Sequence, residues 1–194
     1  MFKDNVFIDA SSLLINSRSI KKDESVTDYI KVNDIELNSK DAKVINRNKG
    51  KYITITFEKE NISNELEILL DLIVNSIKDV LKYLKVNKSS RVLFVGLGNK
   101  DFACDAFGYK VIEKLNISNN TFKMYKDVMG KTNIKSTSFI RNLANLIDSD
   151  LVIVFDSLKA NHISRLGSTI QLATSGLSPG SAYSDKMSVI DKSS

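Results

Sequence analysis

Two aspartates stand where an α/β protein usually places its chemistry. Asp105 lies in the loop after an apolar strand and a glycine turn, within the stretch RVLFVGLGNKDFACDAFG, and Asp156 ends a second apolar strand, DLVIVFD. If the two strands are parallel neighbours, their carboxyl ends meet at one edge of the sheet and the carboxylates come close together. Two such groups do not both ionise easily, so one keeps its proton, and the pair supplies a general base and a general acid. This is the chemistry of metal-free aspartic peptidases, which activate water.

Other interpretations of these residues stay open. Each aspartate could simply end a strand and cap the helix that follows. Cys104 could be a nucleophile with His162 as its base, although a lone cysteine among apolar residues is typically a small buried side chain. The chain holds 1 cysteine and 1 histidine, which excludes an internal disulfide and a cysteine-based zinc site and removes most histidine-centred chemistry. We therefore expect no metal and no cofactor.

The glycine turn before Asp105 invites comparison with phosphate-binding loops. Glycines after a strand let the backbone approach a phosphate, and Gly96, Gly98 and Asn99 fit the start of such a pattern. Asp101 replaces the third glycine of a dinucleotide fingerprint and would repel phosphate, and the chain has no Gly-Lys-Ser/Thr of a P-loop. A nucleotide-binding α/β domain is therefore the least favoured function. We interpret the turn as the element that presents Asp105, with Gly98 and Asn99 as candidate substrate-binding residues.

A second glycine-containing loop, SGLSPGS, follows the last predicted strand. Its consecutive N–H groups and small side chains suit an oxyanion nest or the close passage of a peptide, and a plain surface turn is the alternative. Gly176, Gly180 and Ser181 are its candidate substrate-binding residues. Arg165, which precedes the strand, could orient a carboxylate or a substrate backbone, or form an ordinary salt bridge.

The apolar pattern predicts alternating strands and helices. We expect strands at 52–57, 91–96, 121–125, 150–156 and 169–173, and helices at 65–84, 107–115 and from 136 or 137 to 147. Ser63 and Asn64 are candidate caps of the first helix. The strand at 91–96 is apolar at consecutive positions, which is typical of a strand covered on both faces. The alternation predicts an α/β fold, a three-layer sandwich with a mostly parallel central sheet.

The totals indicate one globular domain. We expect a single domain over the 194 residues, in which residues 1–50 form a peripheral or propeptide-like segment and residues 183–194 a flexible tail. No apolar run is long enough to cross a membrane, and the N-terminus lacks the apolar region of a secretory signal, so we expect a cytoplasmic protein without membrane contact. The net charge of +5 comes from 28 basic residues scattered among 23 acidic ones, so we expect no direct nucleic-acid binding.

Several blocks of the sequence resemble, in the same order, the germination protease family of spore-forming bacteria. The run GLGNKDFACDAFG is similar to that family's Gly-Leu-Gly-Asn motif followed by Thr-Pro-Asp-Ala-Leu-Gly. VMGKTNIKS, FDSL and RLGSTIQLATSGLSPGS resemble later blocks, and KGKYITITFE resembles an earlier strand. The resemblance spans roughly residues 5–185. Blocks in a fixed order are more specific than any one block, and TIQL followed by the SPGS turn is the most telling.

This resemblance implies an endopeptidase of aspartic type that hydrolyses small acid-soluble spore proteins, in the spore core or forespore, during germination. It also implies a zymogen that trims its own N-terminus and assembles as a homotetramer, without a metal or cofactor. The family's proposed aspartate pair falls on Asp105 and Asp156. The family's fold resembles that of hydrogenase maturation peptidases, in agreement with the three-layer sandwich expected from the residues.

The chain departs from the family pattern at several positions. Ala103 and Cys104 replace threonine and proline before the first aspartate, and Lys131 and Asn133 replace a threonine and a glycine in a later block. The family also continues beyond Ser194. These departures keep an alternative open, in which the chain is a catalytically inactive relative that binds spore proteins or a full-length protease.

Overall fold

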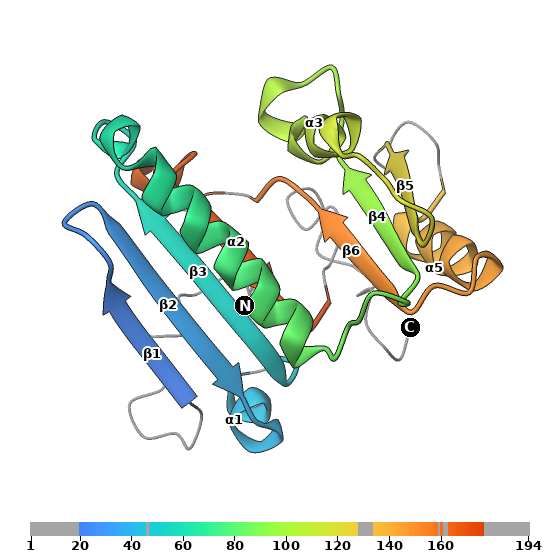
Figure 1. Cartoon of the computed structure of the whole chain (residues 1–194), viewed down its shortest axis with the longest axis horizontal. Helices are drawn as coiled ribbons and strands as arrows, with labels where there is room; N and C mark the ends of the chain where they lie inside the picture. Colours follow the sequence, from blue (N-terminus) through green and yellow to red (C-terminus); the bar gives the residue numbers. More distant parts are fainter. Residues whose placement is uncertain (1–19, 46, 128–133, 159, 161–162, 177–194) are drawn as a thin grey trace, which may run out of the picture. The chain divides into compact units, whose positions relative to one another are not determined.

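The computed structural model describes residues 20–45, 47–127, 134–158, 160 and 163–176, which fall into two compact units (Figure 1). The sheet A unit contains residues 20–85 and 160–175, and the sheet B unit contains residues 86–158 and Gly176. After residue 85 the chain therefore continues in the sheet B unit. The segment 160–175 belongs to the sheet A unit again and supplies the last strand of its sheet.

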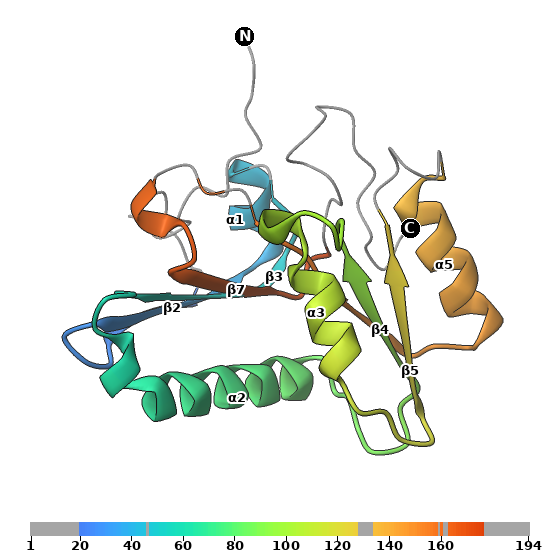
Figure 2. The same cartoon turned by 90° about the horizontal axis from the view of Figure 1, so that it is seen from above.

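The sheet A unit is a four-stranded antiparallel sheet with a long helix on one face. Its strands lie in the order β1-β2-β3-β7, and each neighbouring pair is antiparallel. Figure 2 shows α2 along one face of this sheet and α1 on the other. The elements are β1 (Ile20–Ser25), β2 (Ile30–Leu37), α1 (Ser39–Val44), β3 (Gly50–Phe57), η2 (Ile62–Asn64), α2 (Leu66–Tyr83), η4 (Ile163–Arg165) and β7 (Thr169–Ala173).

The core of this unit lies between α2 and the sheet. Apolar side chains recur at helical spacing along α2, so one side of the helix can be buried against the strands. The buried residues are Ile30, Ile53, Ile55 and Leu69, with Leu72, Ile73, Val80, Ile170 and Leu172 among those packed against them. Beside this cluster, the ammonium group of Lys51 lies 2.9 Å from a carboxylate oxygen of Asp34 and 2.6 Å from one of Asp79, which connects β2, β3 and α2.

The sheet B unit is a three-stranded parallel sheet between two helices. The strand order is β5-β4-β6, and both pairings are parallel. Figure 2 shows α3 and α5 on opposite faces of this sheet. Leu93, Val95 and Leu97 of β4 pack with Ile140 of α5. The elements are β4 (Val92–Leu97), η3 (Ala103–Asp105), α3 (Phe107–Lys114), β5 (Thr121–Lys126), α5 (Ser136–Leu146) and β6 (Leu151–Phe155).

The structure confirms the predicted α/β class. It also confirms a parallel sheet with a helix on each face. Each predicted strand and helix is present, with ends that differ by a few residues. The prediction that Ser63 or Asn64 caps α2 is wrong, because both lie in the 3-10 helix η2 and no side chain caps α2. The apolar pattern did not show that the other strands form an antiparallel sheet, since β7 pairs with β3 across more than a hundred residues of chain.

Candidate active site

The two aspartates belong to the carboxyl edge of sheet B. β4 and β6 are parallel neighbours, and Gly96 pairs with Phe155. Asp156 follows Phe155 directly, so it reaches the level of Leu97, the last residue of β4. Asp105 is carried by the loop that leaves β4 at this same edge. The prediction that the preceding strands are parallel neighbours is therefore confirmed.

The glycine turn after β4 holds Asp105. The carboxylate of Asp105, at the end of η3, accepts a hydrogen bond of 2.9 Å from the backbone N–H of Asn99. Gly98 has a φ of +116°, and a Cβ atom there would lie 2.0 Å from the backbone oxygen of Asp105. Only glycine fits this position. The interpretation of Asp105 as a helix cap is wrong, because the N-cap of α3 is Ala106 and no side chain caps this helix.

Asp156 has the chemistry of a proton donor. Burial, which has the largest effect, and the negative charge of Asp105 together raise the pKa of its carboxyl group from 3.8 to about 6, although the hydrogen bond from the N–H of Ser157 lowers this pKa in part. The two carboxyl groups are thus near enough to interact electrostatically. A carboxyl with a raised pKa beside a second carboxylate is an arrangement typical of acid–base catalysis.

Three further residues at this edge were missed by the sequence reasoning. The Tyr125 hydroxyl, from β5, donates a hydrogen bond of 3.0 Å to the backbone oxygen of Gly98 and so supports the glycine turn. Lys126 is buried and ends β5 at the level of Leu97. Burial lowers the pKa of Lys126, and its ammonium group donates to the backbone oxygen of Asp127 at 2.9 Å.

Ser157 is the third of these residues. Its hydroxyl oxygen is buried and has no hydrogen-bond partner in the described part of the chain. Buried hydroxyls nearly always have a partner, so this group next to Asp156 is suited to bind a water molecule or a substrate. The register of the parallel sheet could have pointed to Tyr125 and Lys126 of β5. For Ser157, the sequence offered only its position beside an aspartate.

The other predicted site residues have different outcomes. Gly98 and Asn99 lie beside Asp105 as described, whereas Gly180, Ser181 and His162 lie outside the described residues. Gly176 is described and is exposed. The prediction of a buried cysteine is wrong, since Cys104 is exposed. No group of three or more His, Cys, Asp or Glu side chains that could hold a metal ion occurs within the described ranges.

The raised pKa of Asp156 predicts a pH dependence of folding stability. The folded chain binds the proton up to about pH 6, whereas the unfolded chain releases it near 3.8. The stabilising contribution is therefore complete below pH 3.8 and is lost as the pH rises through about 6. We expect a loss on the order of 3 kcal/mol over this interval. Urea unfolding at a series of pH values should show it, and the difference between wild type and Asp156→Asn isolates it from other carboxyl groups. Parallel stability curves for the two proteins would contradict the prediction.

Comparison with known proteins decides the family. The family model described as germination protease matches residues 9–194 of this chain. The chain belongs to the germination protease family. It is 27% identical to the germination protease of Geobacillus sp. (strain WCH70), over 98% of this chain and 59% of that protein. It is 30% identical to that of Oceanobacillus iheyensis, over 91% of this chain and 54% of the relative, and 31% identical to that of Clostridium acetobutylicum, over 79% and 54%.

The germination protease family thus accounts for the ordered sequence blocks, and the resemblance seen in the sequence is confirmed. The chain spans between 54% and 59% of the length of these three curated relatives. As for membranes, none of the helices in the described ranges combines the length and apolar character that a transmembrane span requires.

Proposed function

We propose that this chain is an endopeptidase that hydrolyses small acid-soluble spore proteins during germination, in the spore core or forespore, through Asp105 and Asp156. Family membership supports proteolysis in spore germination. The observation that carries the assignment of residues is the pKa of Asp156, which burial and the charge of Asp105 raise to about 6. Gly98, Asn99, Gly176, Gly180 and Ser181 are proposed to bind substrate backbone. A homotetramer formed from a zymogen is part of the same proposal.

The proposed reaction uses the two carboxyl groups in different protonation states. The Asp105 carboxylate takes a proton from water, and the water oxygen forms a bond to the carbonyl carbon of the peptide while the π pair of the C=O bond moves to the carbonyl oxygen. The oxyanion then re-forms the C=O bond as the C–N bond breaks, and the protonated Asp156 gives its proton to the departing amine nitrogen. The pair then holds one proton again, on Asp105, and its transfer back to Asp156 restores the starting state. The chemistry needs only water and these two groups.

The test is cleavage of a purified small acid-soluble spore protein by the full chain, followed by mass spectrometry. We expect cleavage at a small number of sites, unchanged rates in EDTA, and a bell-shaped pH dependence whose limbs belong to the carboxyl pair as a unit. A rate that collapses in EDTA and recovers with added metal would contradict the mechanism. Absence of any cleavage, with the substrate stably bound, would overturn the proposal that this chain is an enzyme.

The second candidate function is binding without catalysis, to spore proteins or to a full-length protease. It is favoured by Cys104, which is exposed and stands where the family pattern has a proline. Isothermal titration with the spore protein, alongside the cleavage assay, separates the two functions. Binding without turnover supports this candidate, and turnover removes it.

A further inference from the structure

The face of sheet A opposite α2 carries a polar surface. Ile55, Ile170 and Leu172 face α2, and side chains alternate along a strand, so their neighbours project from the opposite face. The register forms two rows across β2, β3 and β7. The first row is Lys31, Thr56 and Thr169. The second row is Asn33, Thr54 and Gln171. We call this surface the polar face; it consists of Lys31, Asn33, Thr54, Thr56, Thr169 and Gln171.

Two acceptors on the polar face have no hydrogen-bond partner among the described residues. The hydroxyl oxygen of Thr169 and the side-chain oxygen of Gln171 are buried, and neither makes a hydrogen bond with any described residue. A buried polar atom without a partner destabilises the folded chain, so such atoms are rare unless a ligand or water satisfies them. Both belong to β7, two residues apart, which separates them by about 6.6 Å along the strand. The N–H groups along one side of an extended peptide recur at this same interval.

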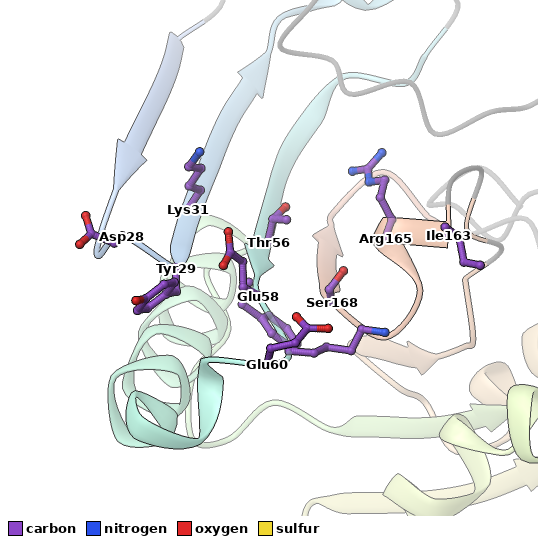
Figure 3. A pocket seen from close by; sticks show the side chains of 11 residues that line it. Asp28, Tyr29, Lys31, Thr56, Glu58, Glu60, Ile163, Arg165 and Ser168 are labelled. Carbon is purple, nitrogen blue, oxygen red and sulfur yellow. The ribbon is translucent and has the colours of Figure 1, made fainter.

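A cavity of about 450 Å³ continues from the end of this face (Figure 3). Its lining includes Lys31, Thr56, Ser168 and Arg165, and Figure 3 shows the side chains of Lys31, Thr56 and Arg165 projecting to the same side of the sheet. Arg165 is half-buried as a residue, yet its guanidinium group makes no ion pair or hydrogen bond with the described residues. A guanidinium in that state is suited to bind a carboxylate with two parallel hydrogen bonds.

The charges around the cavity restrict the ligand. Asp28, Glu58 and Glu60 also line it, so a polyanion such as nucleic acid would be repelled at one part while it is attracted at another. A nucleic-acid backbone also has no N–H groups to offer to Thr169 and Gln171. A peptide can donate hydrogen bonds from its backbone to Thr169 and Gln171. It can also offer Arg165 a single acidic side chain without being a polyanion.

We propose that the polar face of sheet A, together with Arg165, binds an extended polypeptide segment that carries an acidic side chain. Backbone N–H groups of the segment donate to Thr169 and Gln171, and the acidic side chain binds the Arg165 guanidinium, with Lys31 as a second positive charge. All of these residues belong to the sheet A unit. The inference holds whether or not Asp105 and Asp156 are catalytic, and binding rather than cleavage tests it.

The experiment measures fluorescence anisotropy of labelled peptides with the full chain. The probes are Ser-Thr-Val-Thr-Glu-Thr-Val-Ser, blocked at both ends, and its counterpart with glutamine in place of glutamate. We expect the glutamate peptide to bind about tenfold more tightly, as one charge-assisted pair requires. Arg165→Gln should remove this preference, whereas Lys78→Gln, which removes an exposed positive charge from α2, should preserve it.

A second variant separates binding from folding. Thr169→Val removes an unpartnered hydroxyl and keeps the shape of the side chain, so we expect weaker peptide binding by at least about threefold with a Tm that is unchanged or higher. Equal affinity for the two peptides, or equal effects of Arg165→Gln and Lys78→Gln, would overturn the proposal. So would displacement of the peptide by a thymidine oligonucleotide at equal concentration, which would indicate a nucleic-acid surface instead.

Discussion

Replacement of Asp156 by asparagine is expected to reduce the rate of spore-protein cleavage about a thousandfold, with the fold preserved. The amide has nearly the same shape as the carboxyl group, but its N–H protons are not acidic enough to be given to the leaving nitrogen, and general acid–base catalysis contributes about 10²- to 10⁴-fold. The effect should appear in kcat, because the proton moves in the chemical step. Single-turnover cleavage with the variant in excess over substrate measures this step directly.

The matched control is Asp71→Asn. Asp71 is an exposed aspartate of α2, so the same chemical change there should leave the rate within a factor of about two. Asp105→Asn should lose as much activity as Asp156→Asn, and the double variant should lose little more than either one, since residues that act as a unit are not additive. A folded Asp156→Asn protein with more than about a tenth of the wild-type rate would exclude Asp156 as the acid.

Local sequence patterns were sufficient for the parallel sheet and for the placement of both aspartates. β4 is apolar at consecutive positions because α3 and α5 cover its two faces, and that pattern is visible in the sequence. β6 shows the same kind of apolar run. Two such strands separated by a helical segment are usually parallel, and the carboxyl edge of the sheet follows from that. Asp105 and Asp156 could therefore be placed at one edge before their surroundings were known.

The surroundings depended on contacts that local patterns do not carry. Tyr125 supports the glycine turn through a hydrogen bond across strands, and its role follows only from the register of β5 against β4. The polar face needs the pairing of β7 with β3, whose residues are far apart in sequence. The capping prediction for Asp105 failed for a related reason, because the left-handed backbone at Gly98 lets the turn fold back and places the N–H of Asn99 against the carboxylate.

Replacement of Gly108 by alanine is expected to lower the free energy of unfolding by at least about 3 kcal/mol. Gly108 is the second residue of α3, and a Cβ atom there would lie 2.4 Å from the backbone oxygen of Leu97 and 2.5 Å from that of Phe155. The crowding atoms belong to the main chain of β4 and β6, so no side chain can rotate away to make room. Either α3 must move off the strand ends or the sheet must distort. Urea unfolding followed by far-ultraviolet circular dichroism measures the loss.

The control for this substitution is Gly167→Ala. The nearest atom to a Cβ at Gly167 would be Cδ of Lys59, at 3.8 Å, so the methyl group fits and only the left-handed φ of +69° is unfavourable. That conformation costs an alanine roughly 1 kcal/mol. A similar loss for Gly108→Ala and Gly167→Ala would mean that contact of α3 with the strand ends is not what stabilises the sheet B unit.

The Gly108 contact also joins the fold to the proposed chemistry. Asp105 lies three residues before Gly108, and Asp156 follows Phe155, whose backbone oxygen touches this glycine. The absence of a side chain at residue 108 therefore lets the segment that carries Asp105 approach the strand end that carries Asp156. In the folded fraction of Gly108→Ala we expect both a loss of cleavage and a pKa of Asp156 that is lower than in the wild type, because the Asp105 charge moves away. A folded variant that keeps its activity would show that another contact sets the separation of the two carboxyl groups.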